Sequence, residues 1–304
     1  MFELFRSTHA AFPHFFTGVF FVFGAFVGSF LNVCIFRIPA GESIVFPGSH
    51  CACGKAIPFY LNVPVISWIL LRGRAACCGR KISLRYPCVE LLTALVFAAV
   101  WQFLPAAAVV PALLFCALGI VLAFIDWDTM FLPDSVNAVF VLAGVICGAA
   151  FPGALGAGTI FEGFTASLVG LTAGTLVTFW FRFFASVILR REAMGEGDVV
   201  LLGGIGAFLG WKGAIFAFFG SAFVGLAAFA LTKIFARTNI KKSERAGEAS
   251  LLACEGDDEG AEQIARGAGT AFPFGPWLLV AGAVYLFCGE KILALLARLV
   301  FAEF

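Results

Sequence analysis

The chain carries little charge. Asp, Glu, Lys and Arg make up only 13% of its 304 residues, whereas 61% are hydrophobic, and the mean hydropathy is +0.99. A water-soluble domain of this length exposes far more polar surface, so soluble, disordered and collagen-like classes are excluded. A basic excess is also missing, because 20 Lys and Arg residues stand against 19 Asp and Glu residues. We therefore expect no nucleic-acid partner and predict an all-α membrane protein that crosses the bilayer several times.

Long hydrophobic segments recur along the chain. A helical span needs about 20 mostly apolar residues, and roughly eight segments meet or approach that length. The shortest, 199–209, is expected to be either a short span or a half-helix that packs against protein. The first is too long for a signal-peptide core and lacks a cleavage pattern, so we expect it to be a mature helix. The segments are 15–36, 91–104, 109–125, 131–151, 164–187, 199–209, 214–234 and 274–300.

The connections between these segments differ in basic charge. Residues 37–89, 182–191 and 233–266 hold 16 of the 20 Lys and Arg residues, whereas the turns at 105–108 and 152–162 hold none. Basic residues concentrate on the cytoplasmic side of membrane proteins, so we place these three basic connections there. With eight spans, both termini are expected on the opposite side.

Two connections are long enough to be more than turns. Residues 37–89 can form a small cytoplasmic domain, and residues 236–270 are polar and poor in aromatics, which predicts a solvated cytoplasmic linker. We therefore divide the chain into an N-terminal segment with the first helix (1–36), the cytoplasmic domain (37–89) and a transmembrane domain (90–304) that includes the linker.

Four of the ten cysteines are grouped within the cytoplasmic domain, as Cys51 and Cys53 and the adjacent pair Cys77 and Cys78. In a reducing compartment such pairs favour a metal over disulfides. Four thiolates would close a tetrahedral structural Zn²⁺ site and stabilise a domain too small for a large core. Neither pair has the usual C-x-x-C spacing, so free thiols or a vestigial site remain the alternative.

Acidic residues at the ends of apolar segments are the sharpest clue to chemistry. Asp126, Asp128 and Asp134 surround the end of the third segment, and Asp198 opens the sixth. An ionisable group at membrane depth is costly and indicates function. Both groups fall on the predicted cytoplasmic face, so two carboxylates can converge. A pair that shares one proton can activate water with one member and protonate a scissile carbonyl with the other, which is aspartyl peptidase chemistry.

Other interpretations of these acids stay open at this point. Aspartate is a favoured N-cap, so Asp128, Asp134 or Asp198 can simply cap a helix, and a proton or ion relay competes on equal terms. Gly195 and Gly197 precede Asp198. They allow tight backbone turns and the close approach of an extended peptide.

Several short motifs follow one another along most of the chain, and together they resemble one family, the bacterial type IV prepilin peptidases, which are GxGD aspartyl peptidases. A lone GxGD is a weak signal, but the ordered set is specific. The motifs are GSFLNVCIFRIP at 28–39, ESIVFPGSH at 42–50, NVPVISW at 62–68, LRGR at 71–74, ISLRYPCVE at 82–90, Asp126-x₆-Pro133, GEGD at 195–198 and PFGP at 273–276.

The resemblance implies a specific activity. Such enzymes sit in the bacterial cytoplasmic (inner) membrane and cleave the short basic leader of prepilins or type II secretion pseudopilins after a glycine, at the cytoplasmic face. Many then methylate the new N-terminal amine with S-adenosylmethionine. Asp126 and Asp198 would be the catalytic pair, and Gly195, Gly197 and Pro133 would support it. The substrate is a hydrophobic helix in the lipid bilayer with its basic leader inside.

The chain also departs from the family pattern. Its cysteine spacing is altered, with Ala75 where a cysteine is expected, and Val200 stands where Lys is common. The linker is longer than usual. No Gly-rich nucleotide loop follows a strand, so no motif marks a methyl-donor site, and we expect any methyl transfer to use the 37–89 domain. The polar candidates there and beside it are Asn32, Arg37 and Glu42.

Three functions follow from this sequence. The first is a bifunctional leader peptidase and N-methyltransferase, and the second is a peptidase without methyltransferase activity. The third is an ion-coupled membrane transporter or a zinc-stabilised scaffold. A transporter usually carries polar residues deep in several helices and an internal repeat, whereas the acids here gather at one face. We therefore favour the enzyme.

Overall fold

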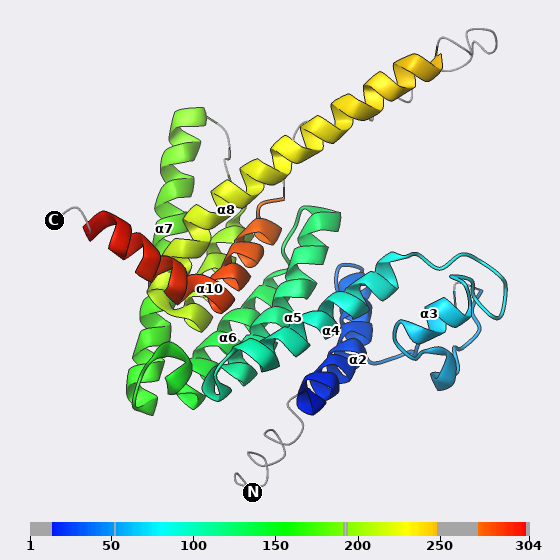
Figure 1. Cartoon of the computed structure of the whole chain (residues 1–304), viewed down its shortest axis with the longest axis horizontal. Coiled ribbons are helices and arrows are strands. Elements are labelled where there is room, and N and C mark those ends of the chain that lie inside the picture. Colours follow the sequence, from blue (N-terminus) through cyan, green and yellow to red (C-terminus); the bar gives the residue numbers. More distant parts are fainter. Residues whose placement is uncertain (1–13, 52, 191, 193, 248–272, 302–304) are drawn as a thin grey trace, which may run out of the picture.

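The computed structural model describes residues 14–51, 53–190, 192, 194–247 and 273–301, and every regular element among them is helical. The predicted all-α class is thus confirmed. Figure 1 shows the helices as a bundle, with a small, mostly irregular unit around α3 beside α2 and α4. The elements are α2 (Phe15–Arg37), η1 (Phe59–Leu61), α3 (Ile66–Leu70), α4 (Arg85–Phe103), α5 (Ala106–Thr129), α6 (Asp134–Ala150), η2 (Pro152–Leu155), α7 (Ile160–Leu189), α8 (Glu196–Gly247) and α10 (Gly275–Phe301).

Most of these helices have the length and composition of membrane spans. Five described helical segments are long and apolar enough to cross a bilayer: α2, α4, α5, α7 and the Glu196–Ala227 part of α8. The helix α6 and the Gly275–Gly289 part of α10 are apolar but shorter. The chain is therefore a membrane protein, while the expected count of eight spans remains a prediction.

The helices α2 and α4 pack closely through glycine. A Cβ atom added to Gly24 would lie 2.8 Å from the Cα of Ala94, and one added to Gly28 would lie 2.8 Å from the Cα of Glu90. Side chains of any larger residue would push the two backbones apart. The 38–84 unit therefore connects two closely packed helices.

The helix α8 bends at Gly210, where φ is 71° and ψ is 175°. A φ in this region is accessible mainly to glycine, so the bend depends on that residue. The part before the bend is inside the protein, since every residue from 201 to 208 is buried. The segment 199–209 thus belongs to the first half of a bent helix, and this half-helix packs against protein.

The second part of α8 continues further than the sequence suggested. Residues 236–247, which we assigned to the linker, are helical and end at Gly247. This stretch is rich in Lys, Arg, Glu and Ala, which favour helix, so its polarity does not interrupt the helix. The rest of the predicted linker, with Cys254, lies outside the described residues.

The half-helix contacts α7 at a point where only glycine fits. A Cβ atom on Gly206 would collide with the backbone oxygen of Gly170. We predict that Gly206→Ala lowers the free energy of unfolding by about 1–3 kcal/mol, because the two backbones must separate. Thermal unfolding in detergent measures the change. The matched control is Gly18→Ala in α2, where an added Cβ meets nothing within 4 Å. A Gly206 variant as stable as this control would show that the close contact is wrong.

Candidate active site and cysteine cluster

Asp126 lies near the end of α5 and is 5% exposed. The helix ends just after it, because Met130 adopts a left-handed conformation and its N–H donates to the Asp126 carbonyl at 2.9 Å. The Asp126 carboxylate accepts a hydrogen bond from the backbone N–H of Gly275, from Gly275 N to Asp126 Oδ2 at 3.1 Å. Gly275 is the first residue of α10, whose first turn has no acidic residue of its own. The Asp126 carboxyl group therefore lies at the N-terminus of α10, a place that favours an acidic side chain.

Asp198 lies in the first turn of α8 and is 8% exposed. A backbone hydrogen bond from Gly195 reaches its carboxylate, and the charge of Asp126 acts on it. Gly275 of α10 lies where α5, α8 and α10 meet. A Cβ atom at this glycine would lie 2.7 Å from Asp126 Oδ2 of α5 and 3.4 Å from Leu201 Cδ2 of α8. Leu201 is one helical turn beyond Asp198. The structure thus brings together two carboxyl groups that are 72 positions apart in the sequence.

Gly197 lies in the first turn of α8, and Gly195 directly precedes that helix. Neither glycine has a positive φ. A Cβ atom on Gly197 would lie 2.8 Å from the Cβ of Leu132. The absence of a side chain therefore lets the first turn of α8 approach the connection between α5 and α6.

Asn137 is a site residue that the sequence reasoning missed. It lies on α6, is 1% exposed, and its Nδ2 donates to the Gly197 carbonyl at 3.2 Å. Its own backbone N–H donates to the Pro133 carbonyl at 3.1 Å, so Pro133 starts α6 in the position that brings Asn137 to α8. The available signal was an amide side chain within an otherwise apolar helix, which needs a partner when buried.

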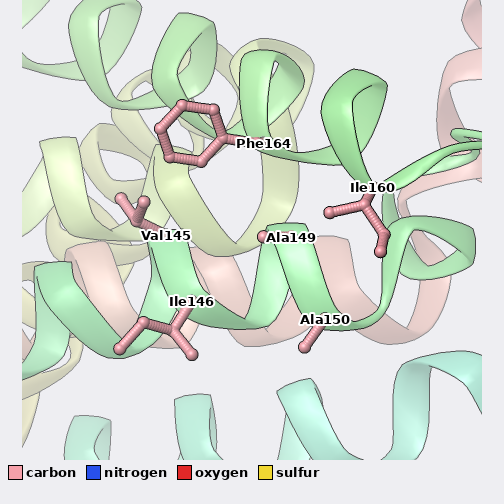
Figure 2. A pocket seen from close by; sticks show the side chains of 6 residues that line it. All are labelled: Val145, Ile146, Ala149, Ala150, Ile160 and Phe164. Atoms are coloured by element: carbon pink, nitrogen blue, oxygen red, sulfur yellow. The ribbon is translucent and has the colours of Figure 1, made fainter.

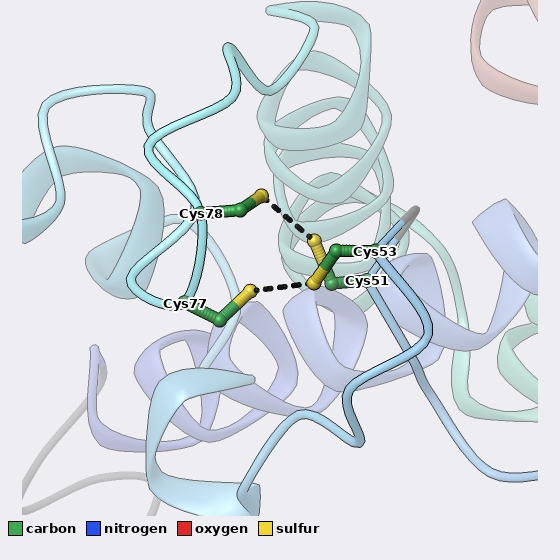
Figure 3. Close-up of side chains that lie close together, drawn as sticks. All are labelled: Cys51, Cys53, Cys77 and Cys78. Carbon is green, nitrogen blue, oxygen red and sulfur yellow. Dashed lines mark hydrogen bonds between the residues drawn. The ribbon is translucent and has the colours of Figure 1, made fainter.

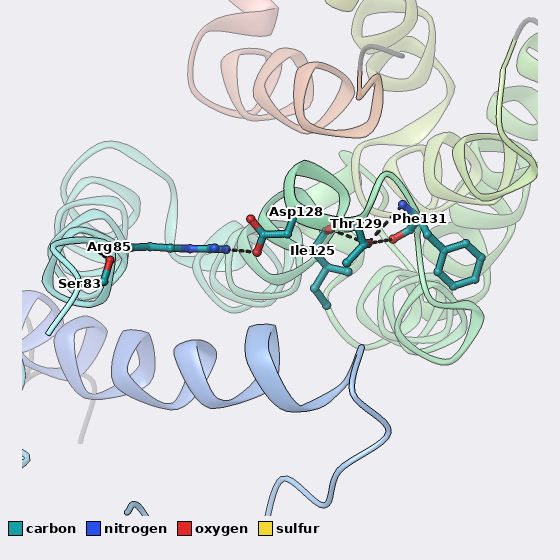
Figure 4. Close-up of polar contacts among 6 residues, drawn as sticks. All are labelled: Ser83, Arg85, Ile125, Asp128, Thr129 and Phe131. Carbon is teal, nitrogen blue, oxygen red and sulfur yellow. Dashed lines mark hydrogen bonds and ion pairs between the residues drawn. The ribbon is translucent and has the colours of Figure 1, made fainter. Parts of the chain in front are cut away.

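The other two acids have different surroundings. Asp128 forms an ion pair with Arg85 of α4, with Arg85 Nη2 2.6 Å from Asp128 Oδ2 (Figure 4). The Arg85 guanidinium lies over the rings of Phe36 and Phe124, at 5.2 and 5.1 Å. This contact joins the α2–α4 pair to α5 two residues beyond Asp126. Asp134 is exposed in the first turn of α6, where its charge suits the helix N-terminus.

An apolar pocket lies at the opposite end of α6 from Asp134 (Figure 2). All of its lining side chains are aliphatic or aromatic, so it offers no group for acid or base chemistry. The carboxyl pair is therefore the candidate active site, and this pocket is not part of it. The lining residues are Val145, Ile146, Ala149, Ala150, Ile160 and Phe164.

Two tight loops present the four grouped cysteines. A single backbone bridge closes the loop at residues 50–56, and another closes the loop at 74–81. Gly54 follows the first cysteine pair with φ 84°, and Gly79 follows the second with φ 68°. Glycine adopts these values without strain, so each chain can reverse directly after its two thiols. The glycine after each pair is the sequence signal that identifies these loops.

The four thiols converge in spite of their unusual spacing (Figure 3). Their sulfur atoms all lie within 4.8 Å of one another, with Cys51 and Cys78 3.6 Å apart and Cys53 and Cys77 3.3 Å apart. Tetrahedral Zn²⁺ with Zn–S bonds of about 2.3 Å separates its sulfur ligands by about 3.8 Å. The geometry therefore fits a zinc ion, and the adjacent cysteines both reach the site.

The thiols also differ in acidity. A backbone hydrogen bond from Cys53, assisted by the thiols of Cys77 and Cys78, lowers the pKa of Cys51 to about 7. Hydrogen bonding to Cys51 and Cys53 raises the pKa of Cys77 to about 12. One thiolate is thus available near neutral pH, whereas a bound metal must displace the proton of another.

The three polar candidates beside this domain have unequal surroundings. Asn32 is 3% exposed, and its Nδ2 donates to the Tyr86 carbonyl at 3.1 Å. Its Oδ1 is buried without a hydrogen-bond partner among the described residues. Arg37 donates to the carbonyls of Ser43 and Gly48 and so holds the loop after α2. Glu42 is exposed in that loop.

Comparison with known proteins gives the family. The sequence model of the bacterial peptidase A24 N-terminal domain matches residues 22–103, and that of the type IV leader peptidase family matches residues 113–230. A prepilin leader peptidase/N-methyltransferase of Myxococcus xanthus is 36% identical, over 93% of this chain and 94% of that protein. The chain belongs to the type IV leader peptidase family.

Other relatives match most of the length of this leader peptidase family member. Prepilin leader peptidase/N-methyltransferases of Aeromonas hydrophila and Dickeya chrysanthemi are each 31% identical to it. The first alignment covers 92% of this chain and 93% of the relative, and the second covers 86% and 89%. No solved structure matches the chain. The N-terminal family match contains the four cysteines, and the second contains both buried aspartates.

The cysteine geometry predicts a bound metal in this family member. The purified protein should contain about one Zn²⁺ per chain, and Cys53→Ser or Cys77→Ser should lose most of it, because three thiolates bind more weakly than four. Zinc content by mass spectrometry measures this. Occupancy should fall as the pH is lowered, since protons compete with the metal for the thiolates.

The control for the zinc experiment is Cys88→Ser. Cys88 is an exposed free cysteine in α4 and lies outside the four-thiol cluster. It should retain the zinc content of the parent protein. If the cluster variants retained as much zinc as this control, the metal would be elsewhere or adventitious.

Proposed function

We propose that the chain is an aspartyl endopeptidase in which Asp126 and Asp198 are the catalytic pair. It removes the leader peptide from type IV prepilins or type II secretion pseudopilins after a glycine. One observation carries the proposal: two buried carboxyl groups, from the end of α5 and the start of α8, lie around the same junction of helix ends inside a helical membrane protein. Burial of ionisable groups at membrane depth is costly, so it indicates a functional site. The relatives that share most of its length are named prepilin leader peptidase/N-methyltransferase.

The geometry supports a mechanism in which the two carboxyls share one proton. The ionised member takes a proton from a water molecule, whose oxygen bonds to the scissile carbonyl carbon. The protonated member gives its proton to the carbonyl oxygen, and collapse of this intermediate breaks the C–N bond with proton transfer to the leaving amine. Gly275 and Gly195 hold the two carboxylates through backbone N–H groups. The proton belongs to the pair rather than to either residue.

The location of the pair suits a membrane-embedded substrate. Asp126 lies near the end of α5 and Asp198 at the start of α8, so both are at helix ends and not at the centre of a span. A prepilin whose hydrophobic helix lies in the bilayer and whose basic leader is in the cytoplasm presents its cleavage site at that depth. We therefore place the site at the cytoplasmic face of the bacterial inner membrane, where the basic connections are also expected.

Methyl transfer is the second proposed activity. S-adenosylmethionine would supply the methyl group for the new N-terminal amine. The buried Oδ1 of Asn32, which has no partner among the described residues, is suited to accept an N–H from an amine at this position. Glu42 lies in the loop that Arg37 holds, so the three candidates belong to one region between α2 and the cysteine domain.

Substitution of either aspartate tests the peptidase directly. Asp126→Asn and Asp198→Asn should each lower cleavage of a prepilin with a Gly-Phe junction by at least about 10³-fold, because an amide can neither share nor transfer the proton. Mass spectrometry of the product in lipid vesicles measures leader loss. Asp134→Asn is the matched control, since this exposed residue lies outside the buried pair. Activity that survives both substitutions would exclude the aspartyl mechanism.

The same assay separates the second activity. Addition of S-adenosylmethionine should increase the mass of the cleaved pilin by one methyl group, and Asn32→Ala should reduce this gain while leaving cleavage intact. Cleavage that never leads to methylation would mean that this chain is a peptidase alone.

Gly275 is expected to control the rate through Asp126. A Cβ atom at this position would lie 2.7 Å from Asp126 Oδ2, so Gly275→Ala must displace the carboxylate. We predict a fall in kcat of about 10–100-fold with little change in KM, as a displacement of about 1 Å produces in other sites. Thermal unfolding of the same variant measures how much stability the displaced carboxylate costs, so that the fall in kcat can be compared at equal folded fractions. The control is Gly18→Ala, and an unchanged kcat in Gly275→Ala would contradict the contact.

A further inference from the structure

The cysteine domain, residues 38–84, exposes apolar side chains that its own fold leaves uncovered. On α3, Ile66, Ile69 and Leu70 are 56, 61 and 76% exposed, whereas Ser67 is buried. The three apolar positions are spaced i, i+3 and i+4, so they lie on one face of the helix. The apolar face of α3 is therefore exposed, whereas a helix of a water-soluble domain buries its apolar face against the core.

Neighbouring parts of the domain share this property. The aromatic residues of η1 are also uncovered, since Phe59 is 87% and Tyr60 62% exposed. In the loop after α2, Val45 and Phe46 are 66 and 77% exposed. Large exposed apolar groups of this kind mark a surface that contacts something other than water. We call these residues and the three on α3 the apolar group of the cysteine domain.

The charges of the same domain are almost all positive. Between residues 38 and 84 the only acidic residue is Glu42, whereas there are five basic residues. All five are exposed, and none forms an ion pair within the described part of the chain. Their charge is therefore available to an anionic partner. The basic residues are Lys55, Arg72, Arg74, Arg80 and Lys81.

Both ends of the domain are attached to membrane helices. The α2 span ends at Arg37, and the α4 span begins at Arg85. The exposed apolar surface of the spans continues to these ends, since Phe30 and Phe36 on α2 and Leu84 before α4 are 50, 42 and 59% exposed. Figure 1 shows the domain beside α2 and α4 and away from α7. Both attachment points of the domain are thus ends of candidate membrane spans.

We infer that the cysteine domain lies on the membrane, with the apolar group inserted at the boundary between headgroups and acyl chains. The five basic residues bind anionic lipid headgroups at the same surface. An interfacial segment requires this combination of apolar and basic side chains. The inference does not depend on the peptidase activity, since it follows from exposure, charge and the two flanking spans.

The occupant is a lipid surface rather than a protein. Charge complementarity favours anionic headgroups, and the uncovered apolar residues continue from the lipid-facing surface of α2. A prepilin or a second copy of this chain would also be able to cover an apolar face, and the experiment must distinguish these partners from lipid.

The test uses the full-length protein in nanodiscs with a photoreactive amino acid at Leu70 or, separately, at Phe59. After illumination, mass spectrometry identifies what is attached. Leu142 on α6, which is 59% exposed, provides a positive control for contact with lipid. Discs of phosphatidylglycerol with phosphatidylethanolamine are compared with discs of phosphatidylcholine, at low and high salt. Prepilin is absent from one set and present in the other.

We expect lipid adducts at Leu70 and Phe59 in the anionic discs. Each basic residue near an anionic surface strengthens binding by about fivefold, so the yield should fall severalfold in neutral discs, in high salt and in the Arg72→Gln/Arg74→Gln variant. Arg182→Gln, which removes a basic residue outside the domain, should leave the yield unchanged.

Other outcomes would overturn the inference. Adducts with a second copy of the chain, or with prepilin in place of lipid, would assign the apolar group to a protein partner. Failure of both probe positions to react with lipid, while Leu142 reacts, would show that the domain stands away from the membrane. Equal yields in anionic and neutral discs would show that the basic residues do not bind headgroups.

Discussion

Burial of two carboxyl groups in a hydrophobic bundle is the costly feature around which the rest of this protein is arranged. Removing even one carboxylate from water is unfavourable, and placing two close together adds repulsion. Backbone N–H groups offset part of that cost: Gly275 donates to Asp126 and Gly195 to Asp198. The first turn of α8 and the first turn of α10 must therefore lie beside the end of α5.

Close backbone packing makes this convergence possible. The buried half-helix of α8 approaches α7 through Gly206 and Gly170, and it approaches the α5–α6 connection through Gly197. The bend at Gly210 then allows the helix to leave the interior. Small residues in these places let three helix ends meet at one site, because each larger side chain would keep a pair of backbones apart. The cysteine domain is supported differently, by four thiols suited to one metal and by its attachment to α2 and α4.

Much of this arrangement follows from the sequence alone. Hydropathy identified the helical segments, and the position of Asp126 and Asp198 at one predicted face led to the proposal that they meet. What the sequence did not reveal depends on distant contacts: Gly275 reaches Asp126 across 149 positions, and Asn137 reaches Gly197 across 60. Polarity suggested a linker at 236–247, where helix propensity prevails instead. The cysteine spacing seemed unfavourable because the reversals at Gly54 and Gly79 are backbone features that a spacing rule does not contain.

In the proposed mechanism Asp126 and Asp198 act as one unit on one peptide bond. Single-turnover cleavage of a prepilin by Asp126→Asn, by Asp198→Asn and by the double variant shows whether they do. Residues that act together lose nearly all of their effect when either is removed, so the double variant should be about as slow as each single one. If the two losses multiplied instead, the aspartates would act independently, and the shared-proton mechanism would be wrong.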